Sequence, residues 1–88
     1  MTYHAYKIKN CCYYSIRIVN VNPTATGGIA IATISAHPHI SHAIRAYNAS
    51  RGAFRDIFMG DSGNIVYYAE SADLNKANDI YLAGAFAI

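Results

Sequence analysis

The sequence predicts an α+β domain in which one main helix, at about residues 36–51, packs on one face of a mostly antiparallel sheet of five or six strands. Most of the chain alternates apolar and polar residues, as half-buried strands do. The segment from Ser35 to Arg51 instead repeats its apolar residues at helical spacing. No linker or repeat divides the 88 residues, so residues 1–88 are expected to form a single domain.

A first strand is expected at residues 3–9, which alternate between apolar and charged side chains. Because successive side chains of a strand point to opposite faces, Tyr6 and Ile8 should point inward. Lys7 and Lys9 should then lie on the open face of the sheet.

Residues 13–21 carry the strongest strand signal, because they are rich in β-branched and aromatic side chains. Alternation places three large residues on the inner face, namely Tyr14, Ile16 and Ile18. Arg17 then points outward. A third strand is expected at residues 29–34, and the glycines that precede it predict an antiparallel hairpin with the second strand.

The helix is predicted from Ile40, Ile44 and Tyr47, whose spacing places them on one stripe that would cover the sheet. Pro38 suits the first turn of a helix, where its missing N–H costs nothing. Gly52 suits the end, because glycine tolerates the positive φ found there.

A second hairpin follows the helix. Residues 53–59 and 65–69 have strand composition, and the intervening G-D-S-G-N at residues 60–64 is typical of a turn. The order of elements up to this point is therefore strand, strand, strand, helix, strand, strand.

The C-terminal segment allows two interpretations. The favoured one is a short helix at residues 72–78, capped by Ser71, followed by a strand at residues 80–88. The alternative is a single helix at residues 73–83.

Composition favours a binding partner. Charged residues make up 14% of the chain, against about 25% in a typical domain, while hydrophobic residues make up 53%. The eight tyrosines, in a chain without tryptophan, support the same view, because tyrosine is enriched at interfaces. A second copy of the chain is one candidate partner.

The net charge and the two cysteines indicate which kinds of partner and which cellular compartment to expect. A net charge of +2 is too small to indicate nucleic-acid binding by itself and has the wrong sign for a DNA mimic. Cys11 and Cys12 are adjacent and therefore poorly placed to bond to each other, so reduced thiols in the cytoplasm are expected. The chain contains neither a signal pattern nor an apolar run long enough to span a bilayer, which predicts a soluble protein.

Catalysis is not expected. His37, His39 and His42 form a cluster that suggests a metal site, but no cysteine or carboxylate lies near them in sequence to complete the ligands. The alternative is that these histidines are simply solvated at the start of the helix. The cysteines have only Lys9 nearby to lower a thiol pKa, and the five acids form no suitably spaced pair. No cofactor is therefore expected.

Two groups of residues are candidates for recognition. The first combines cations with an aromatic ring on neighbouring strands and suits a protein or a nucleic acid; it comprises Lys7, Lys9, Tyr13 and Arg17. The second surrounds the helix and the strand after it; it comprises Arg45, Arg51 and Arg55. Arginine there suggests a protein interface, because its planar fork binds carboxylates through two hydrogen bonds.

The order of a strand, a Ser-capped helix containing A-I-R-A and the hairpin F-R-D-I-F-M-G-D-S-G-N-I-V-Y-Y resembles small α+β proteins of phages and mobile elements, among them anti-CRISPR inhibitors. The resemblance covers mainly Ile29 to Glu70 and concerns architecture and size, so it assigns no functional residue. It implies a stoichiometric inhibitor that binds a host effector complex without catalysis. Many such inhibitors are strongly acidic, whereas this chain is slightly basic.

The sequence therefore predicts a non-enzymatic, cytoplasmic protein-binding domain that inhibits a host defence effector of the CRISPR type by steric occlusion. Its partner is expected to be a protein or a protein–RNA complex. The alternative is a small nucleic-acid-binding module, which would show affinity that falls steeply with salt.

Overall fold

The computed structural model describes residues 1–35 and 41–87, and within them it contains strands and turns but no α-helix. The predicted α+β class is therefore wrong, because the described chain is nearly all β. The strands are β1 (Thr2–Ile8), β2 (Cys11–Val21), β3 (Gly27–Thr33), β4 (His42–Asn48), β5 (Ala53–Met59), β6 (Asn64–Ala69) and β7 (Asn78–Ala87). A single 3₁₀ turn, η1 (Ser71–Asp73), precedes β7.

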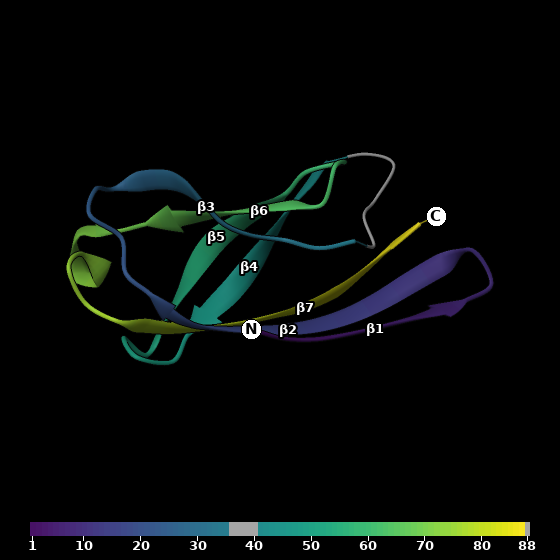
Figure 1. The fold of residues 1–88 in the computed structure, drawn as a ribbon, viewed down its shortest axis with the longest axis horizontal. Helices are drawn as coiled ribbons and strands as arrows, with labels where there is room; N and C mark the ends of the chain where they lie inside the picture. Colours follow the sequence, from purple (N-terminus) through teal and green to yellow (C-terminus); the bar gives the residue numbers. More distant parts are fainter. Residues whose placement is uncertain (36–40, 88) are drawn as a thin grey trace.

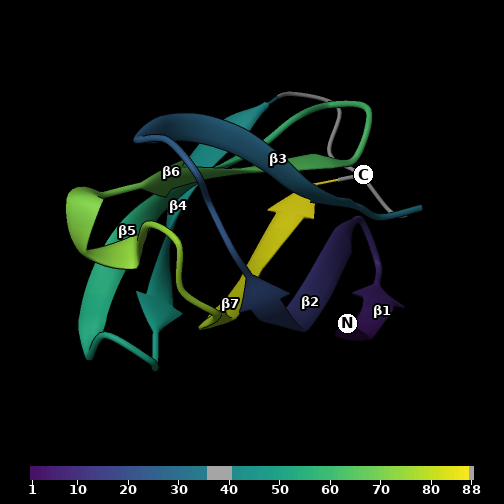
Figure 2. The same cartoon turned by 60° about the vertical axis from the view of Figure 1, so that its left-hand side comes forward.

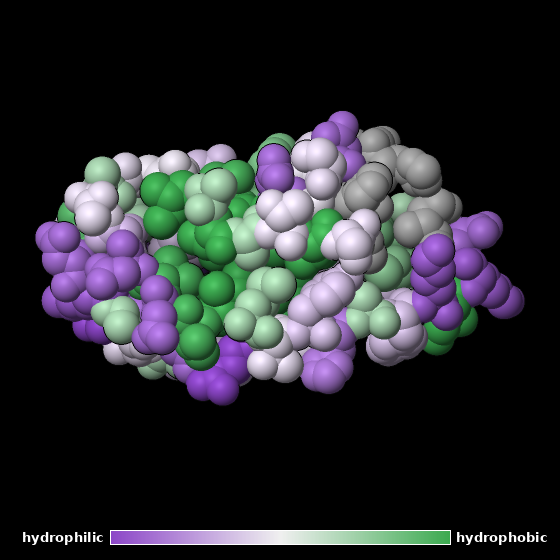
Figure 3. Space-filling view, viewed as in Figure 1, coloured by the Kyte–Doolittle hydropathy of each residue, from purple (hydrophilic) through white to green (hydrophobic). Residues whose placement is uncertain are grey.

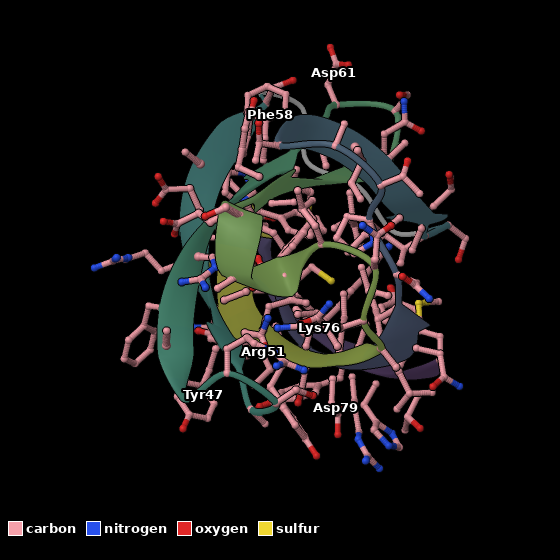
Figure 4. The ribbon with its side chains drawn as sticks, turned by 90° about the vertical axis from the view of Figure 1, so that its left-hand side faces the viewer. Tyr47, Arg51, Phe58, Asp61, Lys76 and Asp79 are labelled. Carbon is pink, nitrogen blue, oxygen red and sulfur yellow. The ribbon has the colours of Figure 1, made fainter. Side chains whose placement is uncertain are left out.

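The strands form one antiparallel sheet in the order β1-β2-β7-β4-β5-β6-β3 (Figure 1). The sheet is curled, and β4 and β5 connect the half that holds β1, β2 and β7 to the half that holds β6 and β3 (Figure 2). A view along the 41 Å long axis shows the strands surrounding the core side chains (Figure 4). The largest apolar side chains of this core with almost no exposed surface are Ile16, Ile57, Met59, Ile65, Tyr67 and Ile80.

The predicted helix at about residues 36–51 is replaced, over its described part, by β4 and a turn; residues 36–40 lie outside the described residues. Alanines on both faces make the apolar pattern of β4 compatible with a period of two as well as with a helix. Ile44 packs against the core while Tyr47 is exposed, so the supposed stripe is divided between two faces.

Pairing with β5 decides the conformation of β4. All seven residues of β4 pair with β5, which satisfies backbone groups of both segments at once. Gly52, interpreted above as a helix end, lies in the β4–β5 turn with a φ of 67°. Its N–H donates to the carbonyl oxygen of Asn48 at 2.8 Å. The residue that suggested the end of a helix therefore closes a hairpin.

The orientation predicted for the first strand is also wrong. Tyr6 and Ile8 are 61% and 54% exposed, because the register of β1 on β2 places Tyr6 opposite Tyr13 on the outer face. Lys7 lies opposite the buried Cys12, on the face that continues into the core. At an edge strand the local alternation does not show which face is covered, so the register with β2 decides.

The second strand has the predicted faces, since Tyr14, Ile16 and Ile18 are buried. The predicted hairpin with the third strand is wrong, because β2 pairs with β1 and β7, while β3 pairs with β6. The loop after β2 contains a buried Pro23, whose carbonyl oxygen accepts the N–H of Asn75 at 2.8 Å. This loop leads the chain to the other half of the sheet instead of back along β2.

The second hairpin is confirmed, with β5 and β6 joined by the predicted turn. Gly63 is required there, because its φ is 90° and a Cβ would collide with the carbonyl oxygen of Ile34. The Ile34 N–H also donates to the Gly63 carbonyl oxygen at 3.0 Å.

The favoured interpretation of the C-terminal segment is confirmed in outline. The helical part shrinks to the single turn η1, and the strand begins at Asn78. The alternative helix at residues 73–83 is wrong, because β7 pairs with β2 along most of its length.

Candidate functional site

The outer face of the sheet, opposite the core, carries a row of large exposed side chains. We call this set the outer row: Arg17 on β2, Tyr81 on β7, Tyr47 on β4 and Phe54 on β5. They lie side by side because Arg17 pairs with Tyr81, Tyr81 with Tyr47, and Tyr47 with Phe54. The three rings are 40–57% exposed: Tyr47 40%, Tyr81 41% and Phe54 57%. Figure 4 shows Tyr47 pointing away from the core.

Contacts within the outer row hold its rings in place. The ring centroids of Tyr47 and Phe54 are 5.3 Å apart, with planes at 59°. The Cζ atom of Arg17 lies 5.3 Å from the centroid of Tyr81, and that of Arg45 lies 5.6 Å from the centroid of Phe54. Such cation–π and ring contacts orient side chains that would otherwise rotate freely in solvent.

A second aromatic group lies nearer the β1 edge of the same face. The rings of Tyr6 and Tyr13 stack with centroids 5.4 Å apart and planes at 18°. We call these two residues the tyrosine pair. Ile8, on the same face of β1, extends the apolar surface beside them.

Small side chains separate the tyrosine pair from the outer row. Ser15 on β2 and Ala83 on β7 are cross-strand neighbours, and both line two shallow depressions of about 500 and about 230 Å³. The larger depression is bordered by the tyrosine pair and the smaller one by Tyr47, Phe54 and Tyr81. The outer face therefore has a trough, lined by Ser15, Ala83 and Ala85, between two groups of rings.

Both arginines of the outer face lie beside carboxylates. Arg17 donates to both carboxylate oxygens of Asp79, at 3.1 and 2.8 Å. The hydrogen bond from Arg17 is the main reason that the pKa of Asp79 is lowered. Arg45 lies 3.9 Å from Asp56. The surface around the rings is thus polar but close to neutral.

Another group of polar side chains is buried, in contrast to the exposed outer row. We call it the polar cluster, and it comprises Asn48, Arg55, Tyr67, Asp73 and Asn78. Arg55 donates to both oxygens of Asp73, at 2.9 and 3.0 Å, and the Tyr67 hydroxyl donates to the same carboxylate at 2.8 Å. Asn48 donates to Tyr67 and Asn78 at 3.1 and 3.0 Å.

Two titratable groups of the polar cluster, Asp73 and Tyr67, have pKa values that are shifted from their ordinary ones. Burial by itself would raise the pKa of Asp73, but hydrogen bonds from Arg55, the Glu70 N–H and Tyr67 together hold that pKa below its ordinary value. Burial, reinforced by the hydrogen bond to Asp73, raises the pKa of Tyr67 to about 12.

Perturbed pKa values often mark catalytic sites, but the arrangement of the polar cluster indicates a structural role. A general base needs a carboxylate oxygen within reach of a substrate proton. Both oxygens of Asp73 already accept hydrogen bonds, and the residue is fully buried. The cluster connects η1 and the start of β7 to β4 and β5, and it thereby closes this end of the molecule.

The structure does not bring the first predicted recognition group together. Tyr13 and Arg17 share the outer face, but Lys7 lies on the other face of β1. Lys9 occupies the β1–β2 turn with a φ of 55°. Of this predicted group, Arg17 is the cation that lies beside an outer-face ring, and it is held by Asp79.

The second predicted group is divided among three environments. Arg45 is exposed on the outer face beside Phe54. Arg51 lies in the β4–β5 turn, where its Nε donates to the side chain of Asn78 at 3.2 Å. Arg55 is 8% exposed and belongs to the polar cluster, so its charge is not presented to a partner.

Of the three clustered histidines, His42 lies among the described residues. His37 and His39 lie outside the described residues, and His42 is half-buried on β4, 6.3 Å from the ring of Phe86. Among residues 1–35 and 41–87, no group of three or more His, Cys, Asp or Glu side chains could hold a metal ion. Cys11 and Cys12 are both free thiols.

Sequence reasoning missed most of the outer row and all the connections of the polar cluster. The sequence predicts Tyr47 in the core because it predicts a helix in place of β4. It predicts Tyr6 in the core because it assigns the inner and outer faces of the first strand the wrong way round. The alternation of Phe54 and Arg55 in a strand is a usable signal, but it does not tell which of the two is buried. Asp73 carried no sequence signal beyond its position near a predicted helix start.

Comparisons of this chain with protein-family models, with curated proteins and with solved structures found no match. In the described part of the chain, no helix is long and apolar enough to cross a membrane. The functional argument therefore rests on the outer face itself.

Proposed function

We propose that this protein is a non-enzymatic binding domain that docks on another protein through the outer face of its sheet. The observation that carries the proposal is the combination of exposed, mutually held aromatic rings with arginines whose charges are balanced by carboxylates. Tyrosine and arginine dominate the binding energy of many protein interfaces. The trough between the two groups of rings offers a place for an apolar side chain of the partner.

Figure 3 views the molecule from the side opposite Tyr47; there, apolar residues reach the surface in the middle, while hydrophilic residues gather at the two ends. The outer row itself places exposed rings beside two arginine–aspartate pairs. An interface usually has an apolar centre and a polar rim. The partner that fits the outer row has an apolar patch of low net charge.

The balanced charges favour a protein over a nucleic acid. Binding to a phosphate backbone depends on lysines and arginines that replace counterions. On the outer face, Arg17 and Arg45 lie beside Asp79 and Asp56, which would repel phosphates at the same place. The tyrosine pair resembles a base-stacking platform, but no unpaired cation adjoins it on that face among the described residues.

Steric occlusion is the mechanism that this proposal implies. A rigid face that covers a partner's working surface blocks it without any chemistry. A host defence complex is proposed as the target only because of the resemblance to phage inhibitors. That resemblance included a helix in this chain, and the structure has the strand β4 in place of its described part. Action in the cytoplasm is supported by the two free cysteines.

The proposal can be tested with two tyrosines of similar exposure. Tyr47 is in the outer row and is 40% exposed, while Tyr68 lies on β6 and is 43% exposed. Partners are captured from a host lysate with the wild-type protein, with Tyr47→Ser and with Tyr68→Ser, and then quantified by mass spectrometry. A specific partner should be retained by the wild type and Tyr68→Ser but lost with Tyr47→Ser.

Equal capture by all three proteins would exclude the outer row as the binding surface. A parallel titration with single-stranded RNA and DNA at increasing salt tests the alternative. Tight binding that weakens steeply with salt, and that disappears in Tyr6→Ser, would overturn the proposal in favour of a nucleic-acid-binding module. Circular dichroism of each variant confirms that the sheet is retained.

A further inference from the structure

The two borders of the sheet differ in how well they are protected against strand pairing. In Figures 1 and 2, β1 forms one border and β3 the other. An edge strand presents unpaired N–H and C=O groups to solvent, and proteins commonly block such edges with bulges, prolines or charges. Glycine also weakens a strand. The β3 border has such protection: it begins with Gly27 and Gly28, and its register shifts between Ala30 and Ala32.

The β1 border has less of this protection, since Lys7 is its one charged side chain. Its seven residues pair with β2 in an unbroken register and include no glycine or proline. All of them are exposed apart from the half-buried Tyr3. A regular, exposed strand of this length, with only one charged side chain, is a template for another strand.

The sequence of β1 is complementary to itself in an antiparallel arrangement. Pairing about a two-fold axis at Ala5 places Thr2 opposite Ile8, Tyr3 opposite Lys7 and His4 opposite Tyr6 of the other strand. This register uses the whole strand and brings no two lysines face to face, whereas an axis at Lys7 would place two lysines opposite each other. Partners in each pair also lie on the same face of the sheet, as the alternation of side chains requires.

We propose that β1 pairs antiparallel with β1 of a second copy, about a two-fold axis near Ala5, so that two sheets join into one. An axis perpendicular to the sheet keeps the outer faces of both copies on the same side. The tyrosine pairs of the two copies then lie near each other across the junction. This pairing is independent of the proposed function, but it would make the outer face a two-fold surface.

The test compares the same substitution at the two borders. Ala5→Lys places like charges opposite each other at the proposed axis, whereas Ala30→Lys adds the same exposed charge to β3. Sedimentation equilibrium should show a concentration-dependent dimer for the wild type and for Ala30→Lys. The dimer dissociation constant of Ala5→Lys should be raised by more than about tenfold. Circular dichroism controls for loss of the fold.

Hydrogen exchange of the wild type supplies a readout that needs no variant. Amides of β1 should exchange more slowly as protein concentration rises, while amides of β3 should not change. A wild type that stays monomeric at every concentration overturns the proposal. So does a dimer that Ala30→Lys disrupts and Ala5→Lys does not, because the contact would then involve β3.

Discussion

Two arginine–aspartate pairs have nearly the same geometry but lie in opposite environments. Arg55 and Asp73 form two hydrogen bonds of 2.9 and 3.0 Å, and Arg17 and Asp79 form two of 3.1 and 2.8 Å. The side chains of the first pair are 8% and 0% exposed, and those of the second are 47% and 25% exposed. The same chemical contact therefore serves a structural role in one place and a surface role in the other.

Burial determines this division of roles. Removing one partner of a buried pair leaves an uncompensated charge, which is costly, whereas water readily replaces a lost partner at the surface. Tyrosine follows the same division: Tyr67 donates its hydroxyl inside the polar cluster, while Tyr47 presents its ring to solvent. Residue type alone does not show which tyrosine or arginine is available to a partner.

The largest expected effect on stability comes from a substitution in the buried pair of Arg55 and Asp73. Asp73→Ala should lower the free energy of unfolding by about 3–5 kcal/mol, because the Arg55 charge loses its buried partner. For a domain of this size such a loss can approach the whole stability. Urea denaturation at neutral pH measures it, with Asp79→Ala as the matched control that should change the midpoint little.

Similar losses in the two variants would contradict the assigned difference between the pairs. If Asp73→Ala does not fold, the milder Asp73→Asn allows the same comparison with Asp79→Asn.

The pH dependence of stability gives an intermediate effect. The pKa of Asp73 in the folded protein lies below its ordinary value of 3.8, so the unfolded chain binds its proton more readily. The stability due to this carboxylate is present above that ordinary value and is lost as the pH falls toward the folded-state pKa. Urea midpoints measured from neutral to acidic pH should fall in this range, and Asp73→Asn should fall less steeply.

Asp79 also has a lowered pKa, so Asp73→Asn should reduce the acid dependence without abolishing it. An unchanged slope in Asp73→Asn would show that another carboxylate controls acid unfolding, and Asp79→Asn then identifies whether the surface pair is responsible.

The smallest expected effect on stability is at the surface pair. Arg17→Gln should leave the thermal midpoint nearly unchanged, because both partners remain accessible to water. Capture of the partner that binds the outer row should nevertheless weaken about fivefold, since the variant removes the cation over Tyr81 and exposes the Asp79 charge. Thermal melts together with quantitative capture check both parts; a large fall in the midpoint would assign Arg17 to the core instead.

Local patterns predicted the parts of the fold that depend on neighbours in sequence. The inner face of β2 and the turn between β5 and β6 followed from alternation and from glycine chemistry. The candidate site was predicted only in part: Arg17 was placed correctly on the outer face, whereas Tyr47 and Tyr6 were assigned inward. Their positions depend on strand pairings that no local pattern encodes.

By itself the sequence determined where most strands run and that the chain carries more apolar and tyrosine surface than a domain of this size hides. Only the tertiary structure decided that β4 is a strand, because its alanines fit either period and pairing with β5 selected one of them. It also decided which arginine is buried: Arg55 meets Asp73 18 residues away, and Arg17 meets Asp79 62 residues away. Contacts at such separations arise from the order of strands in the sheet, which depends on the whole chain.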